Sequence, residues 1–227
     1  MWSPFRDYNY PLHRLLALAA RRHLADFHGR VLDVGCGSSP YRACLPPDVE
    51  YIGVDRGAAV GPAVRARADM AALPFADGVF DGVLCTEVLE QSPRPWQIVR
   101  ELARVLRPGG RLYVTAPFDW HFVDPPYDYF RFTTHGMRAL VEDAGLRVDV
   151  VEPLGGLFTA LNGKLVEEMV QELWLPAAQA VGMKRGAYFL AALATLPWNL
   201  TSSKLLPVLD RWTARNPCSI AVRAVRA

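Results

Sequence analysis

Acidic side chains and glycines follow short apolar runs of this sequence, where they could bind a polar ligand. The first group is Asp33-Val34-Gly35-Cys36-Gly37, at the end of the apolar run that begins at Arg30. Glycines let the backbone turn sharply and come close to a ligand. The free N–H groups of a helix expected at residues 40–45 could bind a carboxylate. Taken alone, this loop is equally consistent with a plain structural turn.

A second acid, Asp55, ends the apolar run at residues 50–55. A carboxylate about 20 residues after a glycine-rich turn can accept hydrogen bonds from two ribose hydroxyls. A surface turn or a helix cap is the alternative role, but the preceding loop favours ribose binding. Up to this point the pattern fits nicotinamide enzymes as well as methyltransferases.

The elements that must position these residues alternate between strands and helices. Short apolar runs predict strands at residues 30–35, 50–55, 80–86, 111–116, 147–152 and 218–226. Amphipathic spacing predicts helices at residues 11–27, 95–106 and 134–144, the last capped by Thr133 or Thr134. This alternation predicts an α/β fold with parallel pairing and right-handed crossovers.

Three further motifs separate the two classes of enzyme. They are Asp69-Met70 before Leu73-Pro74-Phe75, the run Thr86-Glu87-Val88-Leu89-Glu90 after a strand, and Leu106-Arg107-Pro108-Gly109-Gly110 before the next strand. Their order and spacing closely resemble the class I superfamily of S-adenosylmethionine (SAM)-dependent methyltransferases, in particular its bacterial small-molecule (type 11-like) branch. The resemblance covers about residues 31–151. It implies a Rossmann-like, doubly wound, mostly parallel seven-stranded sheet with an antiparallel last strand.

The resemblance also implies a set of SAM-binding residues: Asp33, Gly35, Cys36, Gly37, Asp55, Arg56, Asp69, Met70, Glu87 and Val88. Asp33 and the glycines would hold the methionine part of SAM, and Asp55 the ribose. Asp69 would accept a hydrogen bond from the adenine amino group, while Met70 packs on the ring. Glu87 and Val88 would lie beside the sulfonium.

Two positions depart from the family pattern. Ser39 stands where the glycine loop often has a third glycine, and serine tolerates turns. Gln91 stands where the family often has histidine, which argues against a catalytic base at that position.

The loop at residues 118–132 follows the predicted strand 111–116 and mixes aromatic with charged side chains. Ligands bind at the carboxyl ends of strands in such sheets, and this composition suits a pocket. Our hypothesis is that His121 is a general base or substrate hydrogen-bond partner, and that Trp120, Tyr127 and Arg131 bind the substrate. Alternatively, His121 has only a structural hydrogen bond, and Arg131 forms an ion pair with a carboxylate instead of binding substrate.

Residues 157–216 break the alternation of strands and helices with two or three apolar helices. We interpret residues 1–227 as one methyltransferase domain, with an N-terminal helix region (1–29), a SAM-binding core (30–152), a helical insertion (157–216) and a final strand (218–226). For the insertion, extra core or a lid, a homodimer interface, and a surface resting on a membrane near a lipid-linked acceptor all stay open.

Charge, cysteine content and apolar stretches limit which kinds of partner and cellular location we expect. The formal net charge of +2 argues against nucleic-acid binding. The four cysteines show no metal-like pairing and no CxxC, so we expect free buried thiols, no metal site and no disulfides. No secretory signal is visible, and the apolar stretch at residues 186–200 is short and interrupted by Pro197. We expect a cytoplasmic protein, with peripheral contact at the inner face of the membrane as the variant.

We therefore predict a SAM-dependent methyltransferase acting on a small-molecule, glycan or lipid-linked acceptor. An NAD(P)-dependent oxidoreductase is one alternative, although Pro40 breaks the regular GxGxxG pattern of such enzymes. A non-catalytic module that binds a partner through the insertion is the other. The intact acids Asp33, Asp55 and Asp69 argue against it.

Overall fold

The computed structural model describes the chain apart from residues 1–6, 58–63, 122–124, 181–186, 212 and 214–215. The chain divides into two compact units. Unit 1 consists of Met1–Leu18, Asp119–His121 and Leu154–Cys218, and unit 2 consists of Ala19–Phe118, Phe122–Pro153 and Ser219–Ala227. The single methyltransferase domain expected for the whole chain stays a prediction.

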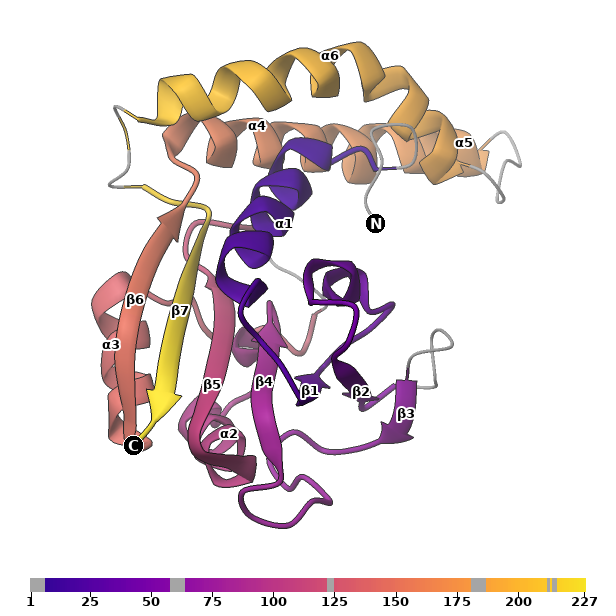
Figure 1. Ribbon diagram of the computed structural model, residues 1–227. Helices are drawn as coiled ribbons and strands as arrows, with labels where there is room; N and C mark the ends of the chain where they lie inside the picture. The colour runs from indigo at the N-terminus through magenta and orange to yellow at the C-terminus, as the bar shows by residue number, and fades with distance from the viewer. Residues whose placement is uncertain (1–6, 58–63, 122–124, 181–186, 212, 214–215) are drawn as a thin grey trace. The chain divides into compact units, whose positions relative to one another are not determined.

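Unit 2 is built on a seven-stranded sheet of order β3-β2-β1-β4-β5-β7-β6 (Figure 1). Strands β1 to β5 pair in parallel, whereas β7 runs antiparallel to β5. The predicted doubly wound, mostly parallel sheet with an antiparallel last strand is therefore confirmed. The strands are β1 (Arg30–Val34), β2 (Glu50–Asp55), β3 (Val64–Arg67), β4 (Phe80–Thr86), β5 (Leu106–Pro117), β6 (Leu146–Leu154) and β7 (Ser219–Arg226).

Helices α2 (Pro95–Val105) and α3 (Thr134–Asp143) lie on one face of this sheet (Figure 1). Buried side chains of α2 pack with Leu112 and Val114 of β5 in the main core. Thr133 caps α3, since its hydroxyl accepts a hydrogen bond from the Gly136 N–H. Tyr113 points to the opposite face, where it stacks on His23 in the last turns of helix α1 (Tyr10–Leu24).

Unit 1 is helical, as predicted for residues 157–216. Its elements are α4 (Leu157–Glu168), the π-helical segment η3 (Met169–Trp174), α5 (Leu175–Ala180) and α6 (Ala187–Asp210). A small core joins these elements, with members such as Val166, Val170 and Ala191. The buried Asp210 at the end of α6 accepts a hydrogen bond from the Phe158 N–H in the first turn of α4.

Some boundaries differ from the prediction. Strand β3 was missed because its sequence, Val-Arg-Ala-Arg, is half charged, as suits an edge strand paired only with β2. Strand β5 begins at Leu106 because that residue pairs with Phe80, so the expected helix stop is already strand. The helix expected at residues 40–45 is a single five-residue 3-10 element, η1 (Pro40–Cys44).

All four cysteines are buried thiols. Of the described helices, none combines the length and apolarity required to cross a bilayer.

Candidate active site

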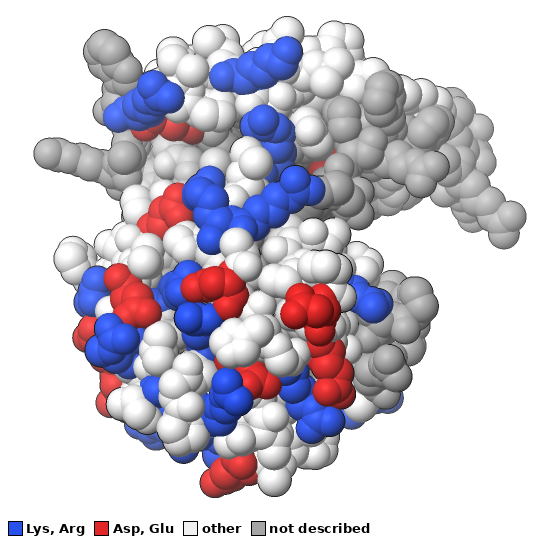
Figure 2. Space-filling view, in the orientation of Figure 1, with Lys and Arg blue, Asp and Glu red and all other residues white. Residues whose placement is uncertain are grey.

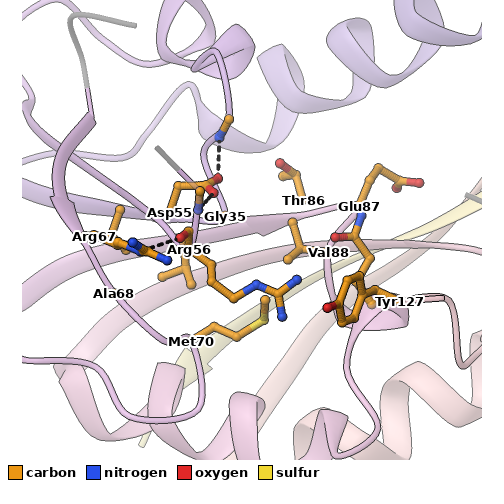
Figure 3. A pocket seen from close by; sticks show the side chains of 15 residues that line it. Gly35, Asp55, Arg56, Arg67, Ala68, Met70, Thr86, Glu87, Val88 and Tyr127 are labelled. Carbon is orange, nitrogen blue, oxygen red and sulfur yellow. Dashed lines mark hydrogen bonds between the residues drawn. The ribbon is translucent and has the colours of Figure 1, made fainter. Parts of the chain in front are cut away.

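A cavity of about 710 Å³ opens at the carboxyl edge of the sheet in unit 2 (Figure 3). It lies where the strand order reverses, between β1 and β4, which is the usual ligand position in open α/β sheets. Its volume falls within the range of small-molecule sites. Eight of the residues predicted to bind SAM or substrate line it: Gly35, Gly37, Asp55, Arg56, Met70, Glu87, Val88 and Tyr127.

The turn after β1 requires glycine at Gly35. Its φ is +70°, and an added Cβ would lie 2.6 Å from Cγ2 of Val88. The N–H groups of Gly35 and Cys36 both donate to the Val54 carbonyl, which fixes this turn to the end of β2. The sequence-based prediction of a tight turn beside a ligand cavity is supported by this geometry.

Asp55 links two turns at the cavity. Its Oδ2 accepts a hydrogen bond from the Gly37 N–H, and its Oδ1 accepts one from the Gly57 N–H, each over 2.9 Å. A carboxylate oxygen can accept more than one hydrogen bond. The carboxylate is therefore fixed in place and retains capacity for two further donors.

Asp33 is buried beneath the turn. Its Oδ2 accepts a 2.6 Å hydrogen bond from the Tyr51 hydroxyl, and its buried Oδ1 has no hydrogen-bond partner among the described residues. The pKa of Asp33 is raised to about 6. Burial is the main cause, the hydrogen bond from Tyr51 opposes it, and the nearby Asp55 charge adds to it. An unsatisfied buried acceptor is costly, so Asp33 is suited to receive a donor.

Glu87 lies directly after β4 with a φ of 52°, which is rare for a residue other than glycine. Its N–H donates to the Thr115 carbonyl at the end of β5, and its Oε1 accepts a 2.6 Å hydrogen bond from the Ser219 hydroxyl of β7. These contacts hold the Glu87 carboxylate at the cavity wall, although the backbone of Glu87 has an unfavourable conformation. Such strain is typical of functional sites.

Glu90 ends the same Glu-Val-Leu-Glu run and is only 2% exposed. The pKa of Glu90 is raised to about 8. Burial is the largest cause, and the charges of Glu87 and Asp128 also raise the pKa. The backbone N–H of Glu90 and the Arg131 charge lower it. Arg131 forms two hydrogen bonds with Asp128, of 2.5 and 2.8 Å. Burial is thus the main reason why the protonated form of Glu90 is favoured, and the neighbouring carboxylates Glu87 and Asp128 act in the same direction.

Arg56 and Tyr127 form one wall of the cavity. The Arg56 guanidinium carbon lies 4.5 Å from the Tyr127 ring centroid, a cation–π contact visible in Figure 3. Arg67 donates from Nε to the Arg56 carbonyl over 2.8 Å. Arg67 could not be identified from the sequence pattern, because it lies in the edge strand β3, which was not predicted.

Several predicted residues are not among those that line the cavity. Asp33 and Cys36 are buried, and Asp69 is exposed and accepts a hydrogen bond from the Ala71 N–H in a local turn. Trp120 and His121 belong to unit 1. His121 Nε2 lies 3.8 Å from Oε1 of Glu167 on α4. Their predicted roles, and that of Arg131, stay predictions.

Residues 32–114 match the family described as methyltransferase domain. The chain carries a methyltransferase domain. The strands whose ends contribute to the cavity are β1, β2, β3 and β4, and they lie within this domain or begin just before it. The seven-stranded sheet of unit 2 has the Rossmann-like fold that solved methyltransferase structures share.

Relatives extend this comparison. The chain is 39% identical over 148 residues to an uncharacterized methyltransferase of Mycobacterium leprae (strain Br4923), covering 52% of this chain and 55% of that protein. The chain thus spans about half the length of the curated relatives it matches.

Two solved structures share the fold. The [4+2]-cyclase SpnF has a TM-score of 0.60 at 19% identity, covering 94% of this chain and 80% of that one. Phosphoethanolamine N-methyltransferase 2 of Haemonchus contortus, in complex with S-adenosyl-L-methionine, has a TM-score of 0.55 at 16% identity, covering 94% and 52%. At these identities the likeness is one of fold alone, which does not determine the reaction.

Proposed function

We propose that this protein transfers a methyl group from SAM to a small-molecule, glycan or lipid-linked acceptor. One observation carries the proposal. The cavity at the carboxyl edge of the methyltransferase domain is lined by Gly35, Asp55, Met70 and Glu87, four of the residues expected to bind SAM. A nicotinamide enzyme or a non-catalytic module has no comparable support.

The residues present fit SAM. Gly35 allows the tight turn with positive φ at the cavity wall, and the buried Oδ1 of Asp33 beneath this turn can accept a hydrogen bond from an ammonium group. Asp55 retains acceptor capacity for two ribose hydroxyls. Met70 offers an apolar surface for adenine. Each part of the cofactor thus meets a side chain of matching chemistry.

Bound SAM supplies an electrophilic methyl group on a sulfonium. The protein must align the acceptor and exclude water, and alignment alone can contribute several kcal/mol. Glu87 presents a carboxylate at the cavity wall, where it favours a cationic ligand. Tyr127, in the same wall, offers an aromatic face to the acceptor.

We retain His121 as the general base or hydrogen-bond partner of the acceptor. His121→Ala is then expected to lower turnover much more than SAM affinity, because the ring acts on the acceptor rather than on the cofactor. Steady-state kinetics and calorimetry on the same preparation measure both. Unchanged turnover in the variant contradicts this role.

Calorimetry with SAM and with NADH tests the proposal directly. SAM is expected to bind, and Asp55→Ala to weaken it by about ten-fold to a hundred-fold through loss of two hydrogen bonds to a charged group. Asp48→Ala, at an exposed aspartate, is the matched control and is expected to bind as the wild type does. Binding of NADH instead of SAM, or equal SAM affinity in Asp55→Ala, contradicts the proposal.

The acceptor can then be identified by its product. Incubating the protein with a cell extract and isotope-labelled SAM is expected to transfer label to one class of molecule. Label in the aqueous fraction indicates a small molecule or glycan, and label in the organic extract indicates a lipid-linked acceptor.

A further inference from the structure

One face of α6 is apolar and exposed along the whole helix. Helix α6 runs for 24 residues, and its other side is buried in unit 1 through residues such as Ala191, Asn199 and Leu206. Six large apolar side chains on the open side are between 37% and 55% exposed: Leu190, Leu193, Trp198, Leu200, Leu205 and Val208. We call these six residues, together with Lys204 and Arg211, the α6 face.

The charges on the α6 face are both basic. Lys204 lies four residues after Leu200, a spacing that places both on the same side of a helix. Arg211 is exposed and directly follows the last residue of α6. No aspartate or glutamate occurs between Ala187 and Leu209. Asp210 is buried and accepts hydrogen bonds from the first turn of α4, so it presents no negative charge at the surface.

A second apolar stripe of unit 1 has the opposite charge. Leu161, Leu165 and Leu173, on α4 and η3, are 54% to 67% exposed. Exposed Glu168 and Glu172 lie among them. In Figure 2, white and blue atoms prevail along the edge where α6 lies. Of the two stripes, the α6 face is therefore the one complementary to an anionic surface.

We propose that the α6 face docks on the surface of an anionic lipid bilayer, with the helix lying in the plane of the interface. Its apolar side chains enter the boundary between head groups and acyl chains. Lys204 and Arg211 extend their charged ends to lipid phosphates while their stems stay in apolar surroundings. No described helix can span a bilayer, so the contact is peripheral.

This contact does not depend on methyl transfer, although it would bring the protein to a lipid-linked acceptor. Co-sedimentation with phosphatidylcholine vesicles, with and without phosphatidylglycerol, tests it. Binding to the anionic vesicles is expected to be more than about ten-fold tighter and to weaken as salt is added, since each basic residue near the surface contributes about five-fold. Absence of binding to anionic vesicles overturns the proposal.

Variants locate the surface. Leu205→Glu, at a 55% exposed position, is expected to weaken binding at least about ten-fold, and Lys204→Gln about five-fold on anionic vesicles alone. Leu173→Glu, at a 67% exposed leucine of the acidic stripe, is the matched control and is expected to bind as the wild type does. Equal losses in Leu205→Glu and Leu173→Glu overturn the assignment to the α6 face.

A second copy of the chain is the competing occupant. Sedimentation velocity without lipid distinguishes it, because docking on lipid predicts the same mass for wild type and Leu205→Glu. A dimer that Leu205→Glu dissociates overturns the proposal. An unchanged circular dichroism spectrum of Leu205→Glu shows that the helices of the variant are folded, and because it needs no SAM, this control keeps the test separate from that of the proposed function.

Discussion

Replacing Glu90 by glutamine is expected to change how the stability of the protein depends on pH. Glu90 is 2% exposed and its pKa is raised from 4.5 to about 8. A carboxyl group whose pKa is higher in the folded chain binds its proton more tightly there than in the unfolded chain. Its stabilising contribution is therefore complete below pH 4.5 and is lost as the pH rises through 8.

The size of this loss follows from the two pKa values. A tenfold change in proton affinity corresponds to roughly 1.4 kcal/mol. Between about pH 5 and about pH 7.5, titration of Glu90 is then expected to lower the free energy of unfolding by about 3 kcal/mol. Glu90→Gln keeps the volume and a neutral polar group, and it removes this contribution because the amide does not titrate.

Urea denaturation followed by circular dichroism at several pH values measures the effect. The difference in unfolding free energy between wild type and Glu90→Gln is expected to fall by about 3 kcal/mol over that interval. Glu142→Gln, at an exposed glutamate of α3 paired with Arg138, is the control and is expected to change the pH dependence by less than about 0.5 kcal/mol. Parallel curves for wild type and Glu90→Gln would refute the reasoning.

Two other substitutions test the Gly35 turn of unit 2 and the Asp210 hydrogen bonds of unit 1. Gly35→Ala is expected to weaken SAM binding by more than about ten-fold, because the added Cβ would contact Val88. Gly109 also has a positive φ, but a Cβ there would have no atom within 4 Å. Gly109→Ala is therefore the control and is expected to leave the SAM affinity measured by calorimetry unchanged. Asp210→Ala is expected to destabilise unit 1 by about 2 to 4 kcal/mol, because it leaves the buried Thr159 hydroxyl and two N–H groups without their acceptor. Faster hydrogen exchange in α4 would report this loss, and unchanged exchange there would contradict it.

The strands at the centre of the sheet could be predicted from sequence because they are buried on both faces. Strands β2 and β4 have the predicted bounds, since runs such as residues 80–86 are mostly apolar. Strand β3 could not be found in this way, because an edge strand exposes one side and tolerates arginine. The glycine turn and Asp55 were predictable because their function depends on local spacing.

The ionisation of the site could not be read from spacing. The raised pKa of Glu90 depends on burial and on Asp128 and Arg131, which lie about 40 residues away in the sequence. The position of His121 also depends on residues far away in the sequence. His121 lies four residues after the end of β5, yet it contacts Glu167 of α4 and belongs to unit 1. Contacts between distant segments decide both properties, and local patterns carry no information about them.

These ionisation states bear on how the cavity can receive a cation. Asp33 and Glu90 have raised pKa values of about 6 and 8, mainly because their burial disfavours the charged form. A positively charged ligand placed near Glu87 would offset that cost and lower both values, because it stabilises the carboxylates. Binding of a cation would therefore release protons, and by linkage its affinity would rise with pH.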